Sequence, residues 1–247
     1  MPLRFLCLHG WGTSEKILRA QLQPLMAELE RDHTASFHFV EGEIESDPGP
    51  GIAGVYEGPY WSYHPFPLRG GDQEPHDQTV LAEAYAMLDE TIAREGPFDG
   101  LLGFSHGGVL AAGYLLRQAR GGGGLPWGGD LPRGPLPRGP LPLPVRCAVF
   151  VNSLPPFRMA PGQRPAIERD LLAPGHPLAL PTVSIVGAQD ALRPYSLALH
   201  ALCEPASAGL VVHSRGHEIP GDRKNVVRMA AAIRKMAVDV SLFPNHC

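Results

Sequence analysis

The pentapeptide Gly-Phe-Ser-His-Gly at 103–107 constrains this chain more than any other feature. It fits G-x-S-x-G, a pattern in which a nucleophilic serine occupies a sharp turn between a strand and a helix. Apolar residues at 98–102 predict a buried strand before the turn, and those at 109–116 predict a buried helix after it. This context favours a catalytic role for Ser105 over a chance turn of glycine and serine.

The steric demands of such a turn explain its two glycines. Residues two positions before and after the serine lie against neighbouring backbone, which Gly103 and Gly107 allow because they lack side chains. The turn also places the serine at the N-terminus of a helix, where backbone N–H groups and the helix dipole favour negative charge.

Alternating strand and helix patterns predict the fold class. Strands are expected at 3–8, 36–40, 98–102, 145–151, 182–186 and 209–213. Helices are expected after Ser14, after Asp77 or Thr79, and at 109–116, 195–202 and 223–238. Strands that alternate with helices predict an α/β fold with a mostly parallel central sheet and helices on both faces. With 247 residues, 44% of them hydrophobic, the chain is expected to form a single domain over 1–247.

Two irregular stretches interrupt this pattern. Residues 41–76 carry several aromatic side chains, and we expect them to form a loop that covers a substrate, with Tyr60, Trp61 and Tyr63 in contact with it. The alternative is a surface loop anchored to the core by its aromatic residues. Residues 121–144 form a Gly/Pro-rich low-complexity segment, which predicts a tolerated insertion without a packed element rather than a proline-motif ligand. The stretch 153–180 is expected to be irregular or partly helical.

Composition narrows the classes of function. The net charge of −4 gives no basic footprint for a nucleic acid, and no apolar run is long enough to span a membrane. The start of the chain shows no signal-peptide pattern, and the four cysteines fit no metal-site spacing. We therefore expect a cytoplasmic protein that uses neither a metal nor a cofactor.

A serine hydroxyl needs a base within hydrogen-bond reach, and the base needs an orienting acid. In α/β-hydrolases these groups follow in the order serine, acid, histidine, each in a loop after a strand. Asp190 follows the predicted strand 182–186, and His217 follows the predicted strand 209–213. The order and the placements together predict the triad Ser105, Asp190 and His217.

Other candidates for the acid and the base fit less well. Asp99 precedes the serine strand and is expected to be structural at the opposite end of the sheet, and Asp222 is expected to cap a helix. His213 lies within a strand, where a core or surface role is expected. His106 adjoins the serine, but the turn should point its side chain away from the hydroxyl.

Acyl transfer also needs backbone donors for the oxyanion. One is expected to be the N–H of His106, the residue after the nucleophile. The second is expected in the His-Gly-Trp-Gly segment at 9–12, where we choose the N–H of Trp11, with Gly12 as an alternative.

Several motifs resemble the FSH family of serine hydrolases, a branch of the α/β-hydrolases common in fungi. They are LCLHGWG at 6–12, EGPYWSY at 57–63, GPFDGLLGFS at 96–105, the turn at 187–190 and the Gly-His pair at 216–217. The similarity covers almost the whole chain except 121–144. His106 departs from the family, in which glutamine is usual, and so does Arg215, where a small residue is common.

The resemblance implies hydrolysis of an ester or thioester through an acyl-enzyme. Some fungal members of the family act beside polyketide synthases, so it further implies a carrier-bound polyketide as one substrate and an acyl carrier domain as a partner. The alternatives are a short-chain carboxylesterase or acyl-protein thioesterase, and a non-catalytic binding protein that retains the fold.

Overall fold

A parallel six-stranded sheet forms the centre of the computed structural model, which describes residues 2–66, 68–69, 74–119, 145–159, 166–167 and 178–242. Its strand order is β11-β10-β7-β6-β1-β2, and every neighbouring pair is parallel. The strands are β1 (Leu3–Leu8), β2 (Ala35–Val40), β6 (Gly100–Phe104), β7 (Cys147–Val151), β10 (Thr182–Gly187) and β11 (Ala208–His213). Because all six point the same way, the loops at their carboxyl ends meet along one edge, where sites of this architecture form.

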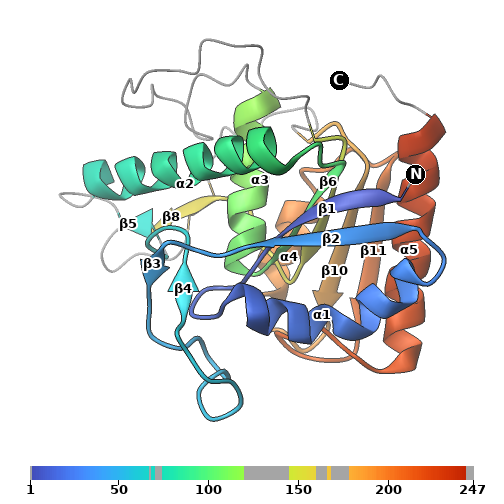
Figure 1. Cartoon of the computed structure of the whole chain (residues 1–247), viewed down its shortest axis with the longest axis horizontal. Helices are drawn as coiled ribbons and strands as arrows, with labels where there is room; N and C mark the ends of the chain where they lie inside the picture. Colours follow the sequence, from blue (N-terminus) through green and yellow to red (C-terminus); the bar gives the residue numbers. More distant parts are fainter. Residues whose placement is uncertain are drawn as a thin grey trace.

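Helices cover both faces of the sheet (Figure 1). They are α1 (Glu15–Glu30), α2 (Glu74–Glu95), α3 (His106–Ala119), α4 (Arg193–His200) and α5 (Arg223–Leu242). The helices α1 and α5 share one apolar cluster with one face of the strands, and α2, α3 and α4 share a second cluster with the other face. The α/β fold predicted from the alternating pattern, with a parallel central sheet and helices on both faces, is therefore confirmed.

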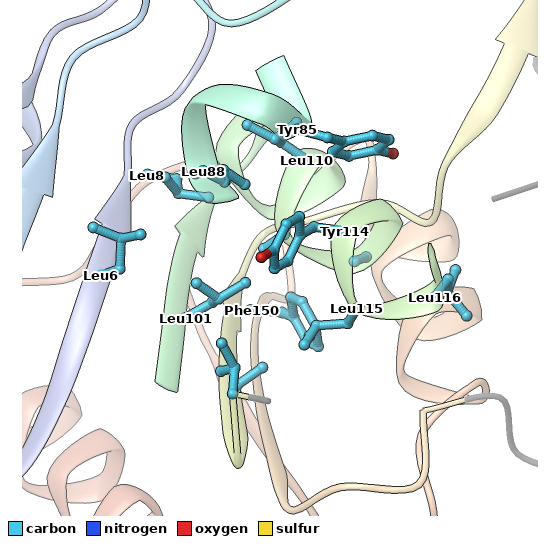
Figure 2. Packing of buried hydrophobic residues seen from close by; sticks show 14 of the residues in the cluster. Leu6, Leu8, Tyr85, Leu88, Leu101, Leu110, Tyr114, Leu115, Leu116 and Phe150 are labelled. Carbon is cyan, nitrogen blue, oxygen red and sulfur yellow. The ribbon is translucent and has the colours of Figure 1, made fainter. Parts of the chain in front are cut away.

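The second cluster packs two tyrosines and several leucines between α2, α3 and the sheet (Figure 2). Tyr85 and Tyr114 are almost fully buried, as are Leu88 and Leu101. Tyr114 keeps its hydroxyl satisfied by donating a hydrogen bond to Asp89 at 2.7 Å. Each buried leucine contributes roughly 1.5–3 kcal/mol from burial, so this packing fixes α3, the helix that begins directly after Ser105.

The first turn of α1 follows its sequence signals. Ser14 is the N-cap residue, and its side chain accepts a hydrogen bond from the N–H of Ile17 at 3.2 Å. The apolar side of this helix is buried, with Leu18 and Leu22 at 0% exposure. The cap fixes where α1 begins, and it thereby limits the segment 9–13, which links β1 to α1, to a short loop.

Several predicted boundaries were wrong. The helix α2 begins at Glu74, so Asp77 and Thr79 lie inside it rather than capping it. Pro75 explains the earlier start, because proline is favoured in the first turn of a helix. The strand before the serine begins at Gly100 rather than at residue 98, because Asp99 accepts a hydrogen bond from the backbone N–H of Arg4 at 2.8 Å and pairs with Arg146.

Short strands occur in stretches that the sequence predicted to be irregular. In the loop after β2, β3 (Ile44–Glu45) pairs antiparallel with β4 (Trp61–Ser62). A second small sheet contains β5 (Leu68–Arg69), β8 (Phe157–Met159) and β9 (Ala166–Ile167). The predicted insertion at 121–144 lies outside the described residues. None of the helices in the described part of the chain has the length and apolar character that a membrane crossing requires.

Candidate active site

Ser105 occupies a strained turn between β6 and α3. Its φ angle is 51°, in the left-handed region that residues other than glycine seldom adopt. A β-carbon on Gly103 would collide with the backbone of Gly108, and one on Gly107 would collide with the carbonyl of Leu8. The glycines are therefore required sterically, as the pattern predicted, and the turn is held by a 2.9 Å hydrogen bond from the Ser105 N–H to the Val151 carbonyl.

Ser105, His217 and Asp190 form one hydrogen-bonded chain. The Ser105 Oγ lies 2.9 Å from Nε2 of His217, and Nδ1 of the same ring lies 2.7 Å from Oδ2 of Asp190. The two segments joined by the first contact are 112 residues apart in the sequence. This arrangement can move a proton from the serine to the imidazole while the carboxylate stabilises the imidazolium that forms.

Each partner of the serine sits in a loop after its own strand. Asp190 follows β10, its side chain is 1% exposed, and its Oδ1 accepts a hydrogen bond from the Leu192 N–H at 2.8 Å. His217 follows β11 and is more open, with its side chain 33% exposed. The Asp190 carboxylate is thus fixed and shielded from water, whereas the His217 ring is partly exposed to solvent.

The rival candidates lie elsewhere. Asp99 lies at the other end of β6, where its carboxylate accepts a hydrogen bond from the Arg4 N–H and pairs with Arg146. These contacts fit the structural role expected for Asp99. The Oδ1 atom of Asp222 accepts a hydrogen bond from the Asn225 N–H at 3.2 Å, just before α5. His213 is buried at 1% exposure within β11. None of these side chains has a described hydrogen bond to Ser105 or His217.

The predicted oxyanion donors belong to two segments that reach the serine, the start of α3 and the loop after β1. His106 is the first residue of α3, so its N–H has no acceptor one turn earlier in the helix. The loop after β1 passes beside Ser105, since a β-carbon on Gly10 would lie 3.7 Å from that of Ser105. The N–H of Gly12 donates to the Trp61 carbonyl at 3.1 Å, whereas the Trp11 N–H has no acceptor among the described residues. The Gly12 N–H is therefore already engaged, and Trp11 stays the predicted second donor.

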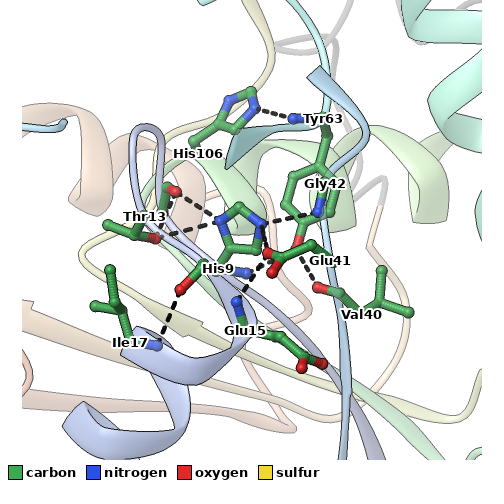
Figure 3. Close-up of polar contacts among 11 residues, drawn as sticks. His9, Thr13, Glu15, Ile17, Val40, Glu41, Gly42, Tyr63 and His106 are labelled. Carbon is green, nitrogen blue, oxygen red and sulfur yellow. Dashed lines mark hydrogen bonds and ion pairs between the residues drawn. The ribbon is translucent and has the colours of Figure 1, made fainter. Parts of the chain in front are cut away.

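A buried network supports this loop (Figure 3). The Tyr63 hydroxyl accepts a hydrogen bond from the His9 N–H at 2.9 Å and donates one to the Val40 carbonyl at 2.9 Å. The Tyr63 N–H donates to Nε2 of His106 at 3.2 Å. Tyr63 therefore joins the loop after β1 to the side chain that follows Ser105. The His106 ring has no described hydrogen bond to the Ser105 hydroxyl.

Two histidines beside the network are held neutral by burial. Burial lowers the pKa of His64 to about 4, although its N–H to the Pro65 carbonyl and nearby Asp77 oppose this. Burial also lowers the pKa of His106 well below its usual range, with further lowering from His64 and His9. The rings of His64 and His106 lie 4.4 Å apart between centroids. A neutral His106 can accept the Tyr63 hydrogen bond, which a doubly protonated ring could not.

The three aromatic residues predicted to contact substrate lie in different surroundings. Tyr63 is 3% exposed and satisfies both hydrogen bonds of its hydroxyl within the protein, so it supports the loop rather than lining open space. The Tyr60 hydroxyl donates to the Tyr56 carbonyl at 2.7 Å. Trp61 lines a pocket of about 200 Å³ at the start of α1. Ser105 is not among the residues that line this pocket.

A smaller apolar cluster lies closer to the serine. It consists of Val109, Leu154 and Phe157, with the partly buried Phe66, Leu192 and Tyr195 packed against them. The N–H of Val109 donates to the Ser105 carbonyl at 3.1 Å, and the Phe66 ring lies 4.9 Å from the His106 ring. Leu192 follows Asp190 by two residues. We name these six residues the elbow cluster. No sequence motif indicated it, because its members come from four separate segments of the chain.

Other reactive groups do not converge on this region. Burial raises the pKa of the thiols of Cys7 and Cys147. Within the described ranges, no group of three or more His, Cys, Asp or Glu side chains is arranged to hold a metal ion.

Comparison with known sequences identifies relatives along almost the whole chain. Residues 1–229 match the family profile described as "Serine hydrolase (FSH1)". The protein named Hydrolase phiM of Talaromyces stipitatus is 43% identical over 246 residues, which cover 98% of this chain and 90% of the relative. The protein named Esterase FPY3 of Fusarium mangiferae is 31% identical, with 95% and 96% covered.

Solved structures with low sequence identity share the fold. Esterase PE8 superposes with a TM-score of 0.58 at 17% identity and covers 96% of each chain. Acyl-protein thioesterase 2 of Zea mays superposes with a TM-score of 0.55 at 14% identity and covers 94% of each chain.

Proposed function

This chain belongs to the FSH1 family of serine hydrolases, and we propose that Ser105, His217 and Asp190 are its catalytic triad. The observation that carries this assignment is the continuous hydrogen-bonded chain from the Ser105 hydroxyl through the imidazole to the Asp190 carboxylate. The reaction proposed is hydrolysis of a carboxylic ester or thioester through an acyl-enzyme. Relatives named as esterases support this reaction class.

In the first half of the reaction, Ser105 Oγ attacks the acyl carbon while its proton passes to Nε2 of His217. The negative charge that develops on the carbonyl oxygen is stabilised by the backbone N–H groups of Trp11 and His106. The imidazolium donates its Nδ1 proton in a hydrogen bond to Asp190. When the tetrahedral intermediate collapses, His217 protonates the departing alcohol or thiol, and the acyl group stays on the serine.

In the second half, His217 removes a proton from a water molecule, whose oxygen attacks the acyl-enzyme. The intermediate collapses again, the proton returns to Ser105, and a carboxylic acid leaves. Both halves use the same donors, so one arrangement serves acylation and deacylation.

Labelling with a fluorophosphonate tests the assignment without knowledge of the substrate. The probe should modify the folded protein at Ser105, and Ser105→Ala should abolish the modification without loss of the fold. A folded protein that does not react would support the non-catalytic alternative. Modification at another residue would show that the nucleophile is wrongly assigned.

We propose that the acyl group lies against the elbow cluster, with Tyr60 and Trp61 at most in contact with its far end. Val109 of the elbow cluster donates its N–H to the Ser105 carbonyl, and the Phe66 ring lies beside the ring of His106, the residue after the serine. Phe66, Leu192 and Tyr195 retain exposed surface. The pocket beside Trp61 lacks such a connection to the serine. An apolar surface of this kind favours a medium-length or aromatic acyl chain over acetate.

A thioester series that shares one thiol tests this placement, because leaving-group reactivity then stays constant. Longer acyl chains should give a higher kcat/KM than acetyl, and Phe66→Ala should narrow that gap more than Trp61→Ala. Equal rates for all chains would favour the short-chain esterase alternative. A gap that only Trp61→Ala narrows would place the acyl group in the pocket beside α1.

The finer proposal is a carrier-bound acyl thioester, such as a polyketide, with the acyl carrier domain as a partner. Its support is the membership of a family in which fungal relatives are named as hydrolases and esterases. The same acyl group should then leave a carrier domain faster than it leaves a small thiol. Equal rates would restrict the substrate to free esters and thioesters.

A further inference from the structure

Asn152 follows β7 directly and has an unusual environment. It is fully buried, with 0% exposure, and its φ angle is 45°. A residue other than glycine is uncommon in this left-handed region, although asparagine tolerates it better than most. No sequence motif singled out this residue, so its buried amide needs a separate explanation.

The amide of Asn152 joins the loops that carry the acid and the base. Its Oδ1 accepts a hydrogen bond from the Gly187 N–H at 2.8 Å, and its Nδ2 donates one to the Glu218 carbonyl at 2.9 Å. Gly187 ends β10, three residues before Asp190, and Glu218 is the residue after His217. The Asn152 side chain thus binds both the segment that leads to Asp190 and the peptide that follows His217.

The neighbours of Asn152 reach the serine turn. The Val151 carbonyl accepts the N–H of Ser105 at 2.9 Å. The hydroxyl of Ser153 lies 3.1 Å from the Gly103 carbonyl, two residues before the serine. The tripeptide 151–153 therefore contacts the segments of all three triad residues, and Asn152 provides the contacts to two of them.

Other bonds between the acid and base loops do not reach the far side of the histidine. The Ala188 N–H donates to the His213 carbonyl at 2.7 Å, and the Gln189 N–H donates to the Arg215 carbonyl at 3.0 Å. Both acceptors precede His217. Of these contacts, only the hydrogen bond from Asn152 to the Glu218 carbonyl reaches the chain after His217. It therefore limits rotation of the segment that orients the imidazole toward Ser105.

We propose that Asn152 is a positioning residue that sets the distance between the His217–Asp190 pair and Ser105. This inference rests on the proposed function of the triad. Asn152 does not touch the reacting atoms, so its effect should appear in kcat more than in KM. A misplacement of a catalytic group by about 1 Å costs roughly 100-fold in rate, which sets the scale of the effect.

Two variants separate the contributions of the amide. Asn152→Gly removes both hydrogen bonds and tolerates the left-handed backbone. Asn152→Asp keeps an acceptor for the Gly187 N–H but loses the donor to the Glu218 carbonyl. Asn225→Ala is the matched control, since this buried asparagine binds Asp222 through its Nδ2 at 2.8 Å and takes no part in the triad.

The kinetic measurement uses the purified full chain, with the concentration of folded protein taken from its unfolding transition. We expect kcat to fall roughly 10- to 100-fold in Asn152→Gly and in Asn152→Asp, with KM within about threefold of the wild type. The rate of fluorophosphonate labelling should fall in parallel. The low-field proton resonance of His217 Nδ1 should shift or broaden in both variants and stay unchanged in Asn225→Ala.

The outcomes distinguish this inference from the proposed function. If the wild type labels at Ser105 but folded Asn152→Gly retains kcat within about twofold, the positioning role is overturned while the triad stands. If Asn152→Gly does not fold, Asn152→Asp decides in the same way. Absence of labelling in the wild type would instead overturn the proposed function.

Discussion

The two halves of the site are built in different ways. The proposed acid–base half consists of Asp190 and His217 in loops after β10 and β11, and Asn152 binds the segments beside both residues. The proposed oxyanion half consists of the loop 9–13 and the start of α3, which Tyr63 joins through hydrogen bonds. The first half presents side chains for reaction, and its histidine side chain is 33% exposed. The second half presents backbone N–H groups, and the side chains that support it are almost completely buried.

This difference follows from what each half must do. A base has to meet both the nucleophile and a leaving group, so its ring must border open space. An oxyanion site stabilises charge by having its donors fixed before the reaction. His9 and His106 are both 0% exposed, and Tyr63 connects them at 2.9 and 3.2 Å. We therefore expect variants of the first half to affect proton transfer, and variants of the second half to affect transition-state charge together with stability.

The largest effect is expected in the acid–base half. Asp190→Asn should lower kcat about 10³- to 10⁴-fold, because it loses the charge that supports the imidazolium and favours the wrong imidazole tautomer. The fold should persist, since the amide keeps the size of the carboxyl and can accept the Leu192 hydrogen bond. The measurement is kcat on a reactive ester, with Asp222→Asn as the control outside the triad. A loss of less than about tenfold would exclude Asp190 as the orienting acid.

A smaller effect is expected in the oxyanion half. Tyr63→Phe removes the acceptor of the His9 N–H and the donor to the Val40 carbonyl. We expect kcat to fall roughly 10-fold as the loop carrying Trp11 loosens. The free energy of unfolding should fall by about 1–3 kcal/mol because buried polar groups lose their partners.

Tyr60→Phe is the matched control for this experiment. It removes a hydroxyl from the same loop, but that hydroxyl binds the Tyr56 carbonyl and has no described hydrogen bond to the loop after β1. Its kcat should stay close to that of the wild type. If both variants lower kcat equally, the link from Tyr63 to the oxyanion loop does not matter for catalysis.

The features that could be predicted from the sequence fall mainly in the first half of the site. The serine turn and the order of Asp190 and His217 were readable because side-chain chemistry and strand ends leave local patterns. Tyr63 was expected at the substrate, but its hydroxyl proved to be enclosed by β1 and β2. Asn152 went unnoticed because its partners lie 35 and 66 residues away. Contacts to backbone atoms of distant segments leave no pattern in a sequence, so the supports of the site required the structure.

Boundary errors have a similar origin. The strand before the serine was expected to start at 98, but Asp99 binds Arg4 and Arg146 and the ladder begins at Gly100. The second cluster of the core could be predicted from helical periodicity, because Leu81, Tyr85 and Leu88 recur on one face of α2. The positions of helices and strands could therefore be predicted from local periodicity. Their exact boundaries depend on polar contacts between distant segments, which the sequence does not reveal.

An effect on stability alone, outside both halves of the site, is expected in acid. The pKa of His64 is about 4 in the folded protein because burial disfavours its charged form, whereas in the unfolded chain it is near 6.5. Between these values the unfolded state binds more protons, so the free energy of unfolding should fall as the pH is lowered from about 6.5 to about 4. The stability lost through this residue is on the order of 3 kcal/mol, and the loss is complete only below the folded pKa.

Urea unfolding at a series of pH values from neutral to acidic measures this loss. His64→Gln should reduce the pH dependence, because glutamine does not titrate. His33→Asn should leave it unchanged, since His33 is exposed in the turn after α1. An identical pH dependence in the wild type and His64→Gln would show that His64 takes up no proton on unfolding.

Trapping of the acyl-enzyme tests the central claim most directly. A slowly deacylating ester is mixed with the protein, the reaction is quenched in acid, and the modified peptide is located by mass spectrometry. The account predicts one acyl group on the peptide that contains Ser105, none in Ser105→Ala, and a longer-lived adduct in Asp190→Asn. An acyl group on another residue of the active wild type would contradict the account, and so would turnover by Ser105→Ala at the wild-type rate.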